Sequence, residues 1–97
     1  MNRAEPPQIL CATPHGRVLL FTLQTGQGLP SHRHPQHWGI ITVLSGTLAA
    51  TFGGMQTLSR SEVFRFDANE PIELRAATDD TCFLVTLIPM TPPETLP

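Results

Sequence analysis

The sequence has no lysine, and only 14% of its 97 residues are charged. Its basic residues are all arginines, which are scattered along the chain, and the formal net charge is -2. Proteins that bind nucleic acid or an anionic membrane surface normally concentrate Lys and Arg in one patch or stripe. The sequence therefore argues against both kinds of partner.

Closely spaced cysteines and long apolar runs are also missing. Cys11 and Cys82 lie far apart in the sequence and match neither a disulfide framework nor a zinc-binding motif. No apolar run approaches the roughly 18 residues of a membrane span, and residues 1–10 contain no apolar signal core. We therefore expect a cytoplasmic protein.

Helical periodicity is absent as well. No apolar stripe with a 3.6-residue period continues for ten residues, and Gly or Pro interrupts the chain roughly every eight to twelve residues. A short strand is expected from Ile9, and segments rich in branched or aromatic residues predict further strands at residues 17–25, 39–44, 47–52, 55–59, 61–66, 71–76 and 81–88. This pattern predicts an all-β sandwich or barrel.

The length indicates one domain that spans residues 1–97. We expect its core at about residues 17–88, a loosely docked lead-in at residues 1–8 and a Pro-rich tail at residues 89–97. The segments 39–44 and 81–88 carry apolar side chains on both faces, whereas an antiparallel sheet normally exposes one face to water. A second copy of the chain would most simply bury the apolar side chains on the outer face of this sheet, so we expect a homodimer.

Three histidines, His32, His34 and His37, are the side chains best suited to form a binding site. Side chains at i and i+2 of a strand lie on the same face, so His32 and His34 are expected to converge. Imidazole binds Zn, Cu, Fe and Ni, which makes a divalent transition metal the natural ligand. His37 reaches the same pocket if the chain bends at Pro35 and a strand resumes near His37. The alternative is a solvated loop of polar histidines.

The spacing around these histidines resembles the first motif of the cupins, which are small jelly-roll barrels of two antiparallel sheets. Gly26, five residues, His32-Arg33-His34, four residues, Gly39, six residues and Gly46 reproduce that motif, except that the family has a metal-binding glutamate at position 39. The second motif is less complete. Ser61 stands for its first glycine, residues 67–69 for Pro-x-Gly, and Ile72 for its metal-binding histidine. The resemblance covers about residues 17–88 and implies a single-domain cupin-type barrel.

The resemblance also implies an altered metal site. Only His32 and His34 remain of the four family ligands, because Gly39 and Ile72 have no metal-binding side chain. His37 is the best substitute, since it lies two residues before Gly39 and would share its inward face. Glu73 is the second choice, and it points inward only if a bulge shifts the register by one residue. Gly39 facing inward would direct Trp38 outward.

Two functional classes follow from the resemblance. In the first, His32, His34 and His37 hold a divalent metal ion (Zn, Ni, Fe, Mn or Cu), and the protein is a metal-dependent dioxygenase or isomerase that acts on a small molecule. In the second, the barrel binds or senses a small molecule without turnover, with or without metal. No residue stands out as a general base, so the catalytic residues are left unassigned and neither class is chosen at this point.

Overall fold

A computed structural model describes residues 6–90 of the chain. These residues form nine β-strands and no helix, which confirms the all-β prediction. The strands are β1 (Gln8–Thr13), β2 (Gly16–Leu23), β3 (Gly28–His32), β4 (His37–Ser45), β5 (Thr47–Thr51), β6 (Met55–Ser59), β7 (Val63–Asp67), β8 (Ile72–Ala76) and β9 (Thr81–Pro89). Residues 6–90 thus offer no helical segment with the length and hydrophobicity needed to span a bilayer.

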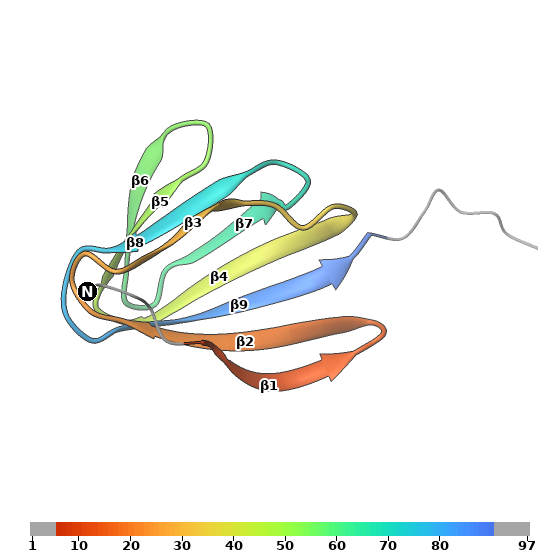
Figure 1. Ribbon diagram of the computed structural model, residues 1–97, viewed down its shortest axis with the longest axis horizontal. Coiled ribbons are helices and arrows are strands. Elements are labelled where there is room, and N and C mark those ends of the chain that lie inside the picture. Colours follow the sequence, from red (N-terminus) through yellow and green to blue (C-terminus); the bar gives the residue numbers. More distant parts are fainter. Residues whose placement is uncertain (1–5, 91–97) are drawn as a thin grey trace, which may run out of the picture.

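The strands form two sheets, and all of their pairings are antiparallel. One sheet has the order β1-β2-β9-β4-β7, and the other has the order β3-β8-β5-β6. Figure 1 shows the two sheets facing each other, with the β1–β2, β3–β4 and β7–β8 connections at the same end of the molecule, on the right of the view. We call this end the mouth of the barrel.

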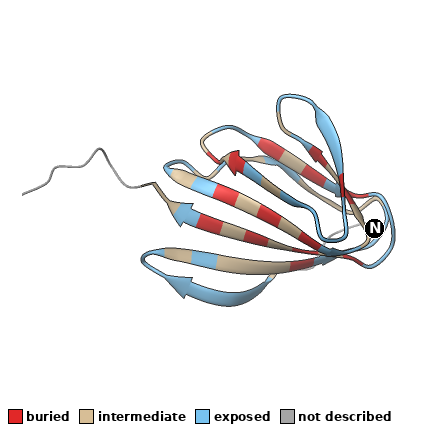
Figure 2. Ribbon diagram, turned by 180° about the vertical axis from the view of Figure 1, so that it is seen from behind, coloured by how far each residue is buried: buried red, intermediate tan, exposed pale blue. Residues whose placement is uncertain are grey.

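The core lies between the two sheets. Along β4 and β9, buried residues alternate with half-buried or exposed ones (Figure 2). The fully buried side chains on these strands include Ile41, Val43, Phe83 and Leu87. In β4, this alternation continues back to the first residue, so His37 shares the inward face of Gly39 and Ile41 and lies nearest the mouth.

The three histidines lie between the end of β3 and the start of β4. β3 ends at His32, so His34 lies just beyond it, but the alternation of half-buried His32 and His34 with exposed Arg33 continues. The chain then turns at Pro35-Gln36 and β4 begins at His37, two residues before the predicted strand, so the condition for His37 to face inward is met. Gln36 has a φ of 66°, the left-handed conformation that a tight turn often needs. The His34 N–H donates to Ala68 O at 2.8 Å, which fixes the loop against the end of β7.

Gly46, the last glycine of the first motif, lies at the opposite end of the barrel. Its φ is 77°, and a Cβ at this position would collide with Thr81, whose Cα would be only 2.7 Å away. Thr81 is fully buried, and its hydroxyl donates to Thr78 O at 2.7 Å. Glycine is therefore required here both by the backbone conformation and by the close approach of the start of β9.

Candidate functional site

His32 and His34 lie side by side at the mouth. Their ring centroids are 5.0 Å apart and the rings are nearly perpendicular, at 89°. The Nδ1 atom of His32 is 2.7 Å from Pro30 O. A carbonyl oxygen only accepts hydrogen bonds, so this Nδ1 carries the proton and the Nε2 of the neutral ring keeps a free lone pair. The predicted convergence of these two side chains is confirmed.

His37 is anchored in the same manner, because its Nδ1 lies 2.9 Å from Pro35 O. It is half-buried on the inward face of β4, and its charge influences His34, but it does not line the cavity that the other two histidines border. His15, the remaining histidine, is exposed on the β1–β2 turn, as expected.

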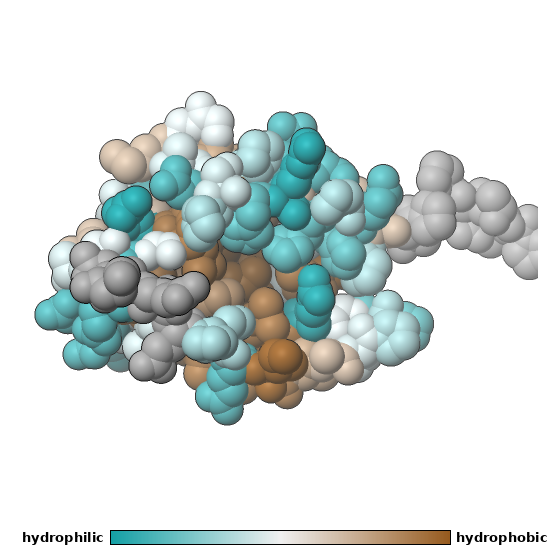
Figure 3. Space-filling model, viewed as in Figure 1, coloured by the Kyte–Doolittle hydropathy of each residue, from teal (hydrophilic) through white to brown (hydrophobic). Residues whose placement is uncertain are grey.

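Beneath His32 and His34 lies a small cavity of about 30 Å³ between the two sheets. Apart from the two imidazoles, its walls are entirely apolar: Leu19, Phe21, Leu29, Ile41, Phe66, Ile72, Leu74 and Val85. Figure 3 shows brown, hydrophobic side chains in the hollow between the strands, bordered by teal, hydrophilic ones. A polar entrance over an apolar floor is the usual arrangement of a small-molecule site.

The environment of His34 disfavours its charged form. Burial lowers the pKa of His34 below its ordinary value of 6.5, and the nearby positive groups of His32, Arg17 and His37 lower it further. The neutral imidazole is therefore the favoured state of His34 near pH 7. Among residues 6–90, the charged groups that lower the pKa of His34 are thus a guanidinium and two imidazoles.

Arg17 is a mouth residue that the sequence analysis did not identify. It belongs to the inward series of β2 with Leu19 and Phe21, and it pairs with Leu87. Leu87 also pairs with Gly39, so Arg17 and the position of the missing glutamate lie in one row across the sheet. The alternation of residues 17, 19 and 21 was the available signal, but an arginine at the start of a strand usually faces solvent.

Apolar groups occupy the places of the two lost family ligands. A Cβ on Gly39 would lie 2.6 and 2.8 Å from Cε1 and Cε2 of Phe66, so this ring fills the space of a side chain at position 39. Ile72 is buried and lies opposite His32 in the β3–β8 pairing. The inner surface beside the histidines is therefore hydrophobic where the family has a carboxylate and an imidazole.

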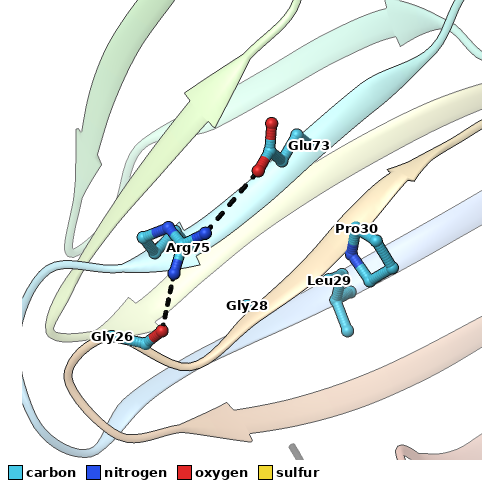
Figure 4. Close-up of a pocket in the computed structure, with 6 residues that line it drawn as sticks. All are labelled: Gly26, Gly28, Leu29, Pro30, Glu73 and Arg75. Atoms are coloured by element: carbon cyan, nitrogen blue, oxygen red, sulfur yellow. Dashed lines mark hydrogen bonds and ion pairs between the residues drawn. The ribbon is translucent and has the colours of Figure 1, made fainter. Parts of the chain in front are cut away.

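Glu73, the second choice for a metal ligand, lies on the outer face of β8. The irregularity in the β3–β8 pairing falls in β3, between Leu29 and His32, and leaves Ile72 inward. Glu73 instead forms an ion pair with Arg75 at 3.7 Å. Figure 4 shows both side chains at a second hollow, of about 360 Å³, where Arg75 also donates to Gly26 O at 2.8 Å. Arg75 is thus held by the carboxylate of Glu73 and by the backbone of Gly26.

The histidines meet a metal site's requirements only in part. Two imidazoles that bind one ion with metal–nitrogen distances of about 2.1 Å have ring centres roughly 4.5 to 5 Å apart, so His32 and His34 are compatible with two coordination positions. Across residues 6–90, however, no three His, Cys, Asp or Glu side chains are grouped so that they could hold an ion. A three-histidine site would require His37 to rotate toward the pair.

The two facing antiparallel sheets, with histidines at one end, define a small β-barrel of the jelly-roll class. A family model described as a cupin domain matches residues 19–88, and the chain belongs to the cupin family. A comparison with curated proteins finds no matching relative.

Solved structures share this fold. An RmlC-like cupin protein from Desulfovibrio desulfuricans is 27% identical, with a TM-score of 0.78, over 88% of this chain and 82% of the other. A cupin protein from Bacteroides fragilis is 24% identical, with a TM-score of 0.79, over 96% of this chain and 84% of the other. KdgF from Halomonas sp. is 20% identical, with a TM-score of 0.79, over 88% of this chain and 80% of the other. The last two likenesses concern the fold alone.

Proposed function

We propose that this cupin binds a small organic acid without chemical turnover. The carboxylate of the ligand lies at the mouth beside Arg17, His32 and His34, and its short apolar body enters the cavity below. The observation that carries this proposal is the row across the sheet that joins Arg17 to the position of the missing glutamate, above cavity walls that include no acidic residue among residues 6–90.

The chemistry of these groups favours an anion. Arginine binds carboxylates through two parallel N–H···O bonds, and such charge-assisted bonds are stronger than neutral ones. Protonation of the His34 imidazole would add a second charged donor beside the anion. Where the cupin family has a negatively charged glutamate, this chain has Gly39, and the positively charged Arg17 lies in the same row across the sheet.

The cavity limits the ligand's size. A volume of about 30 Å³ accommodates only a short aliphatic group, and the apolar walls would leave a hydroxyl or ammonium group there without a partner. We therefore expect short straight-chain carboxylates to bind better than sugars or other polyhydroxylated compounds.

Calorimetry and thermal unfolding with acetate, butyrate and hexanoate test this proposal, with butanol and butylamine as probes that lack the negative charge. Butyrate should bind and raise the melting temperature, since a ligand that binds only the native state stabilises it. Arg17→Gln should weaken butyrate binding by about tenfold or more, the effect of losing one charge-assisted bond. Arg33→Gln is the matched control, because Arg33 is exposed between the two histidines. The proposal fails if no carboxylate binds, or if both variants weaken binding equally.

A second candidate is a divalent metal site at His32, His34 and His37. It is supported by the backbone carbonyls that hold Nδ1 of His32 and His37, since metal-binding histidines commonly have such partners. A bound ion would polarise an oxygen atom of a small substrate, as a dioxygenase or isomerase requires. The chain's own contribution would be to hold three neutral imidazoles, and neither candidate assigns a general base.

Metal analysis of the purified protein separates the two candidates. If the metal site exists, zinc, nickel, manganese, iron or copper should be present in stoichiometric amount, or should raise the melting temperature when added. His37→Ala should abolish that rise, whereas His15→Ala, at an exposed turn, should leave it intact. Stabilisation by butyrate after treatment with a chelator would support the metal-free site instead.

A further inference from the structure

We propose that the hollow beside Glu73 and Arg75 binds a free α-amino acid with an apolar side chain. Arg75 holds the carboxylate of the ligand, and Glu73 holds its ammonium group. We call this place the outer hollow, and its other lining residues are Gly26, Gly28, Leu29 and Pro30. The inference does not rest on the ligand proposed for the mouth, because different charged groups recognise the two ligands.

Glu73 and Arg75 project together from the outer face of β8. They alternate with the buried Ile72 and Leu74, which line the mouth cavity on the inner face. Side chains at i and i+2 of a strand share one face, so the strand itself places these two opposite charges side by side. Among residues 6–90, none of the other residues of β3, β5, β6 and β8 is Asp, Glu, Lys or Arg. The four-stranded sheet thus presents one acidic and one basic side chain, next to each other.

The strands on either side of β8 leave space around the two charges. Arg75 pairs with Gly28 of β3 and with Ala49 of β5, neither of which has a long side chain. A Cβ at Gly28 would collide with Leu74 O and lie 3.2 Å from Arg75 Cα, so position 28 requires glycine. The open space of about 360 Å³ lies within the range of about 300–1,000 Å³ that small-molecule pockets have.

The ion pair between Glu73 and Arg75 can open to a ligand at little cost. Its closest nitrogen and oxygen atoms are 3.7 Å apart, beyond the usual N–H···O hydrogen-bond distance of about 2.7–3.2 Å. The side chains of Arg75 and Glu73 are 58% and 44% exposed, and exposed pairs contribute little to stability. Arg75 Nη1 also donates to Gly26 O at 2.8 Å, which holds the guanidinium at the hollow (Figure 4). A ligand therefore meets a positioned cation and a neighbouring carboxylate.

The two charges together select a ligand that carries both signs. A simple carboxylate pairs with Arg75 but is repelled by Glu73, and a simple amine meets the reverse situation. In an α-amino acid, the carboxylate and the ammonium group are attached to one carbon atom, so they can contact two neighbouring side chains at once. Guanidinium binds carboxylate through two parallel bonds, and ammonium donates charge-assisted bonds to carboxylate. The amino acid zwitterion is therefore the matching class of ligand.

Leu29 and Pro30 determine which amino acids fit. Figure 4 shows them on β3, on the other side of Gly28 from the charged pair. Both side chains are apolar, so an aliphatic ligand side chain that packs against them is removed from water. We therefore expect leucine to bind better than glycine, which has no side chain to bury, and better than aspartate, whose second carboxylate would lie near Glu73.

Titration of the full chain with leucine, followed by the NMR resonance of the Gly28 amide, tests the proposal. The matched probes are 4-methylpentanoate and 3-methylbutylamine, which keep the side chain of leucine but each lack one of its two charges. Leucine should shift the Gly28 resonance and bind about tenfold more tightly than either probe, the effect of one charge-assisted bond. This signal reports the outer hollow, so the result does not depend on whether the mouth binds a carboxylate.

Two variants separate the roles of the charged groups. Arg75→Gln should weaken leucine binding by about tenfold or more. Glu73→Gln should weaken it as well and should abolish the preference for leucine over 4-methylpentanoate, because the ammonium group then has no charged partner. Arg60→Gln and Glu70→Gln are the matched controls. They remove the same charges at exposed positions between strands, and they should bind leucine as the wild type does.

Circular dichroism establishes that the four variants are folded. The proposal is overturned if leucine at about 10 millimolar leaves the Gly28 resonance unshifted, a concentration that detects even millimolar affinity. It is also overturned if 4-methylpentanoate binds the wild type as tightly as leucine does, or if Arg75→Gln weakens binding no more than Arg60→Gln. A Glu73→Gln variant that keeps the preference for leucine would exclude the role given to Glu73 and overturn the proposal equally.

Discussion

The ring of Phe66 lies against the backbone of Gly39, where a Cβ would come within 2.6 Å of Cε1. The two residues face each other in the β4–β7 pairing, and Phe66 is 5% exposed. This contact accounts both for the lost ligand position and for the apolar wall at the mouth. It fills the space of a metal-binding carboxylate with an aromatic ring, and it builds part of the apolar wall beneath His32 and His34.

Gly39→Ala should destabilise the protein through this contact. Gly39 does not have a positive φ, so the cost is steric and should be about 1–3 kcal/mol, the range of overpacked cores. Phe66→Leu should relieve the clash, so the double variant should lose less stability than the sum of the two single variants. Denaturant unfolding of all four proteins measures this coupling. Additive losses would show that the Phe66 ring does not restrict position 39.

The stability of the ligand-free protein should fall as the pH falls below about 6.5. The pKa of His34 is lower in the folded state than the ordinary 6.5, so the unfolded state binds more protons between the two values. Stability is therefore complete above pH 6.5 and decreases down to the folded-state pKa. Urea unfolding at pH 7.5, 6.5 and 5.5 measures the loss.

His34→Gln should flatten this profile, because glutamine does not titrate. His15→Gln should leave the profile unchanged, since His15 lies on an exposed turn away from the cavity. A profile that is identical in the wild type and in His34→Gln would contradict the role given to His34.

The pH dependence of binding should distinguish an organic acid from a metal ion. A carboxylate favours protonated imidazoles, so its affinity should rise as the pH decreases from 8 to 6. Metal binding requires neutral imidazoles, so protons compete and its affinity should fall over the same range. Calorimetric titration with butyrate and with zinc, each at pH 8, 7 and 6, gives both signs. Butyrate affinity that weakens toward pH 6 would contradict the anion site.

Much of the fold was accessible from local sequence signals. Glycines and prolines at short intervals, together with the lack of helical periodicity, indicated an all-β chain, and the outcome agrees for residues 6–90. The sequence left open whether the chain bends at Pro35; it does turn at Pro35-Gln36, and His37 returns to the inward face of β4. Glu73 was ranked second because Ile72 precedes it on a strand, and it does face away from the cavity.

The spacing of His32 and His34 alone determined that these two side chains would share one side of the chain, because alternation is a local property of extended backbone. Only the tertiary structure decided what surrounds them. Arg17, Phe66 and Ile72 come from three other strands, and their positions at the mouth depend on sheet register, which pairs residues far apart in the sequence. The charge and hydrophobicity of the site are therefore products of strand pairing, and no motif in the sequence contains them.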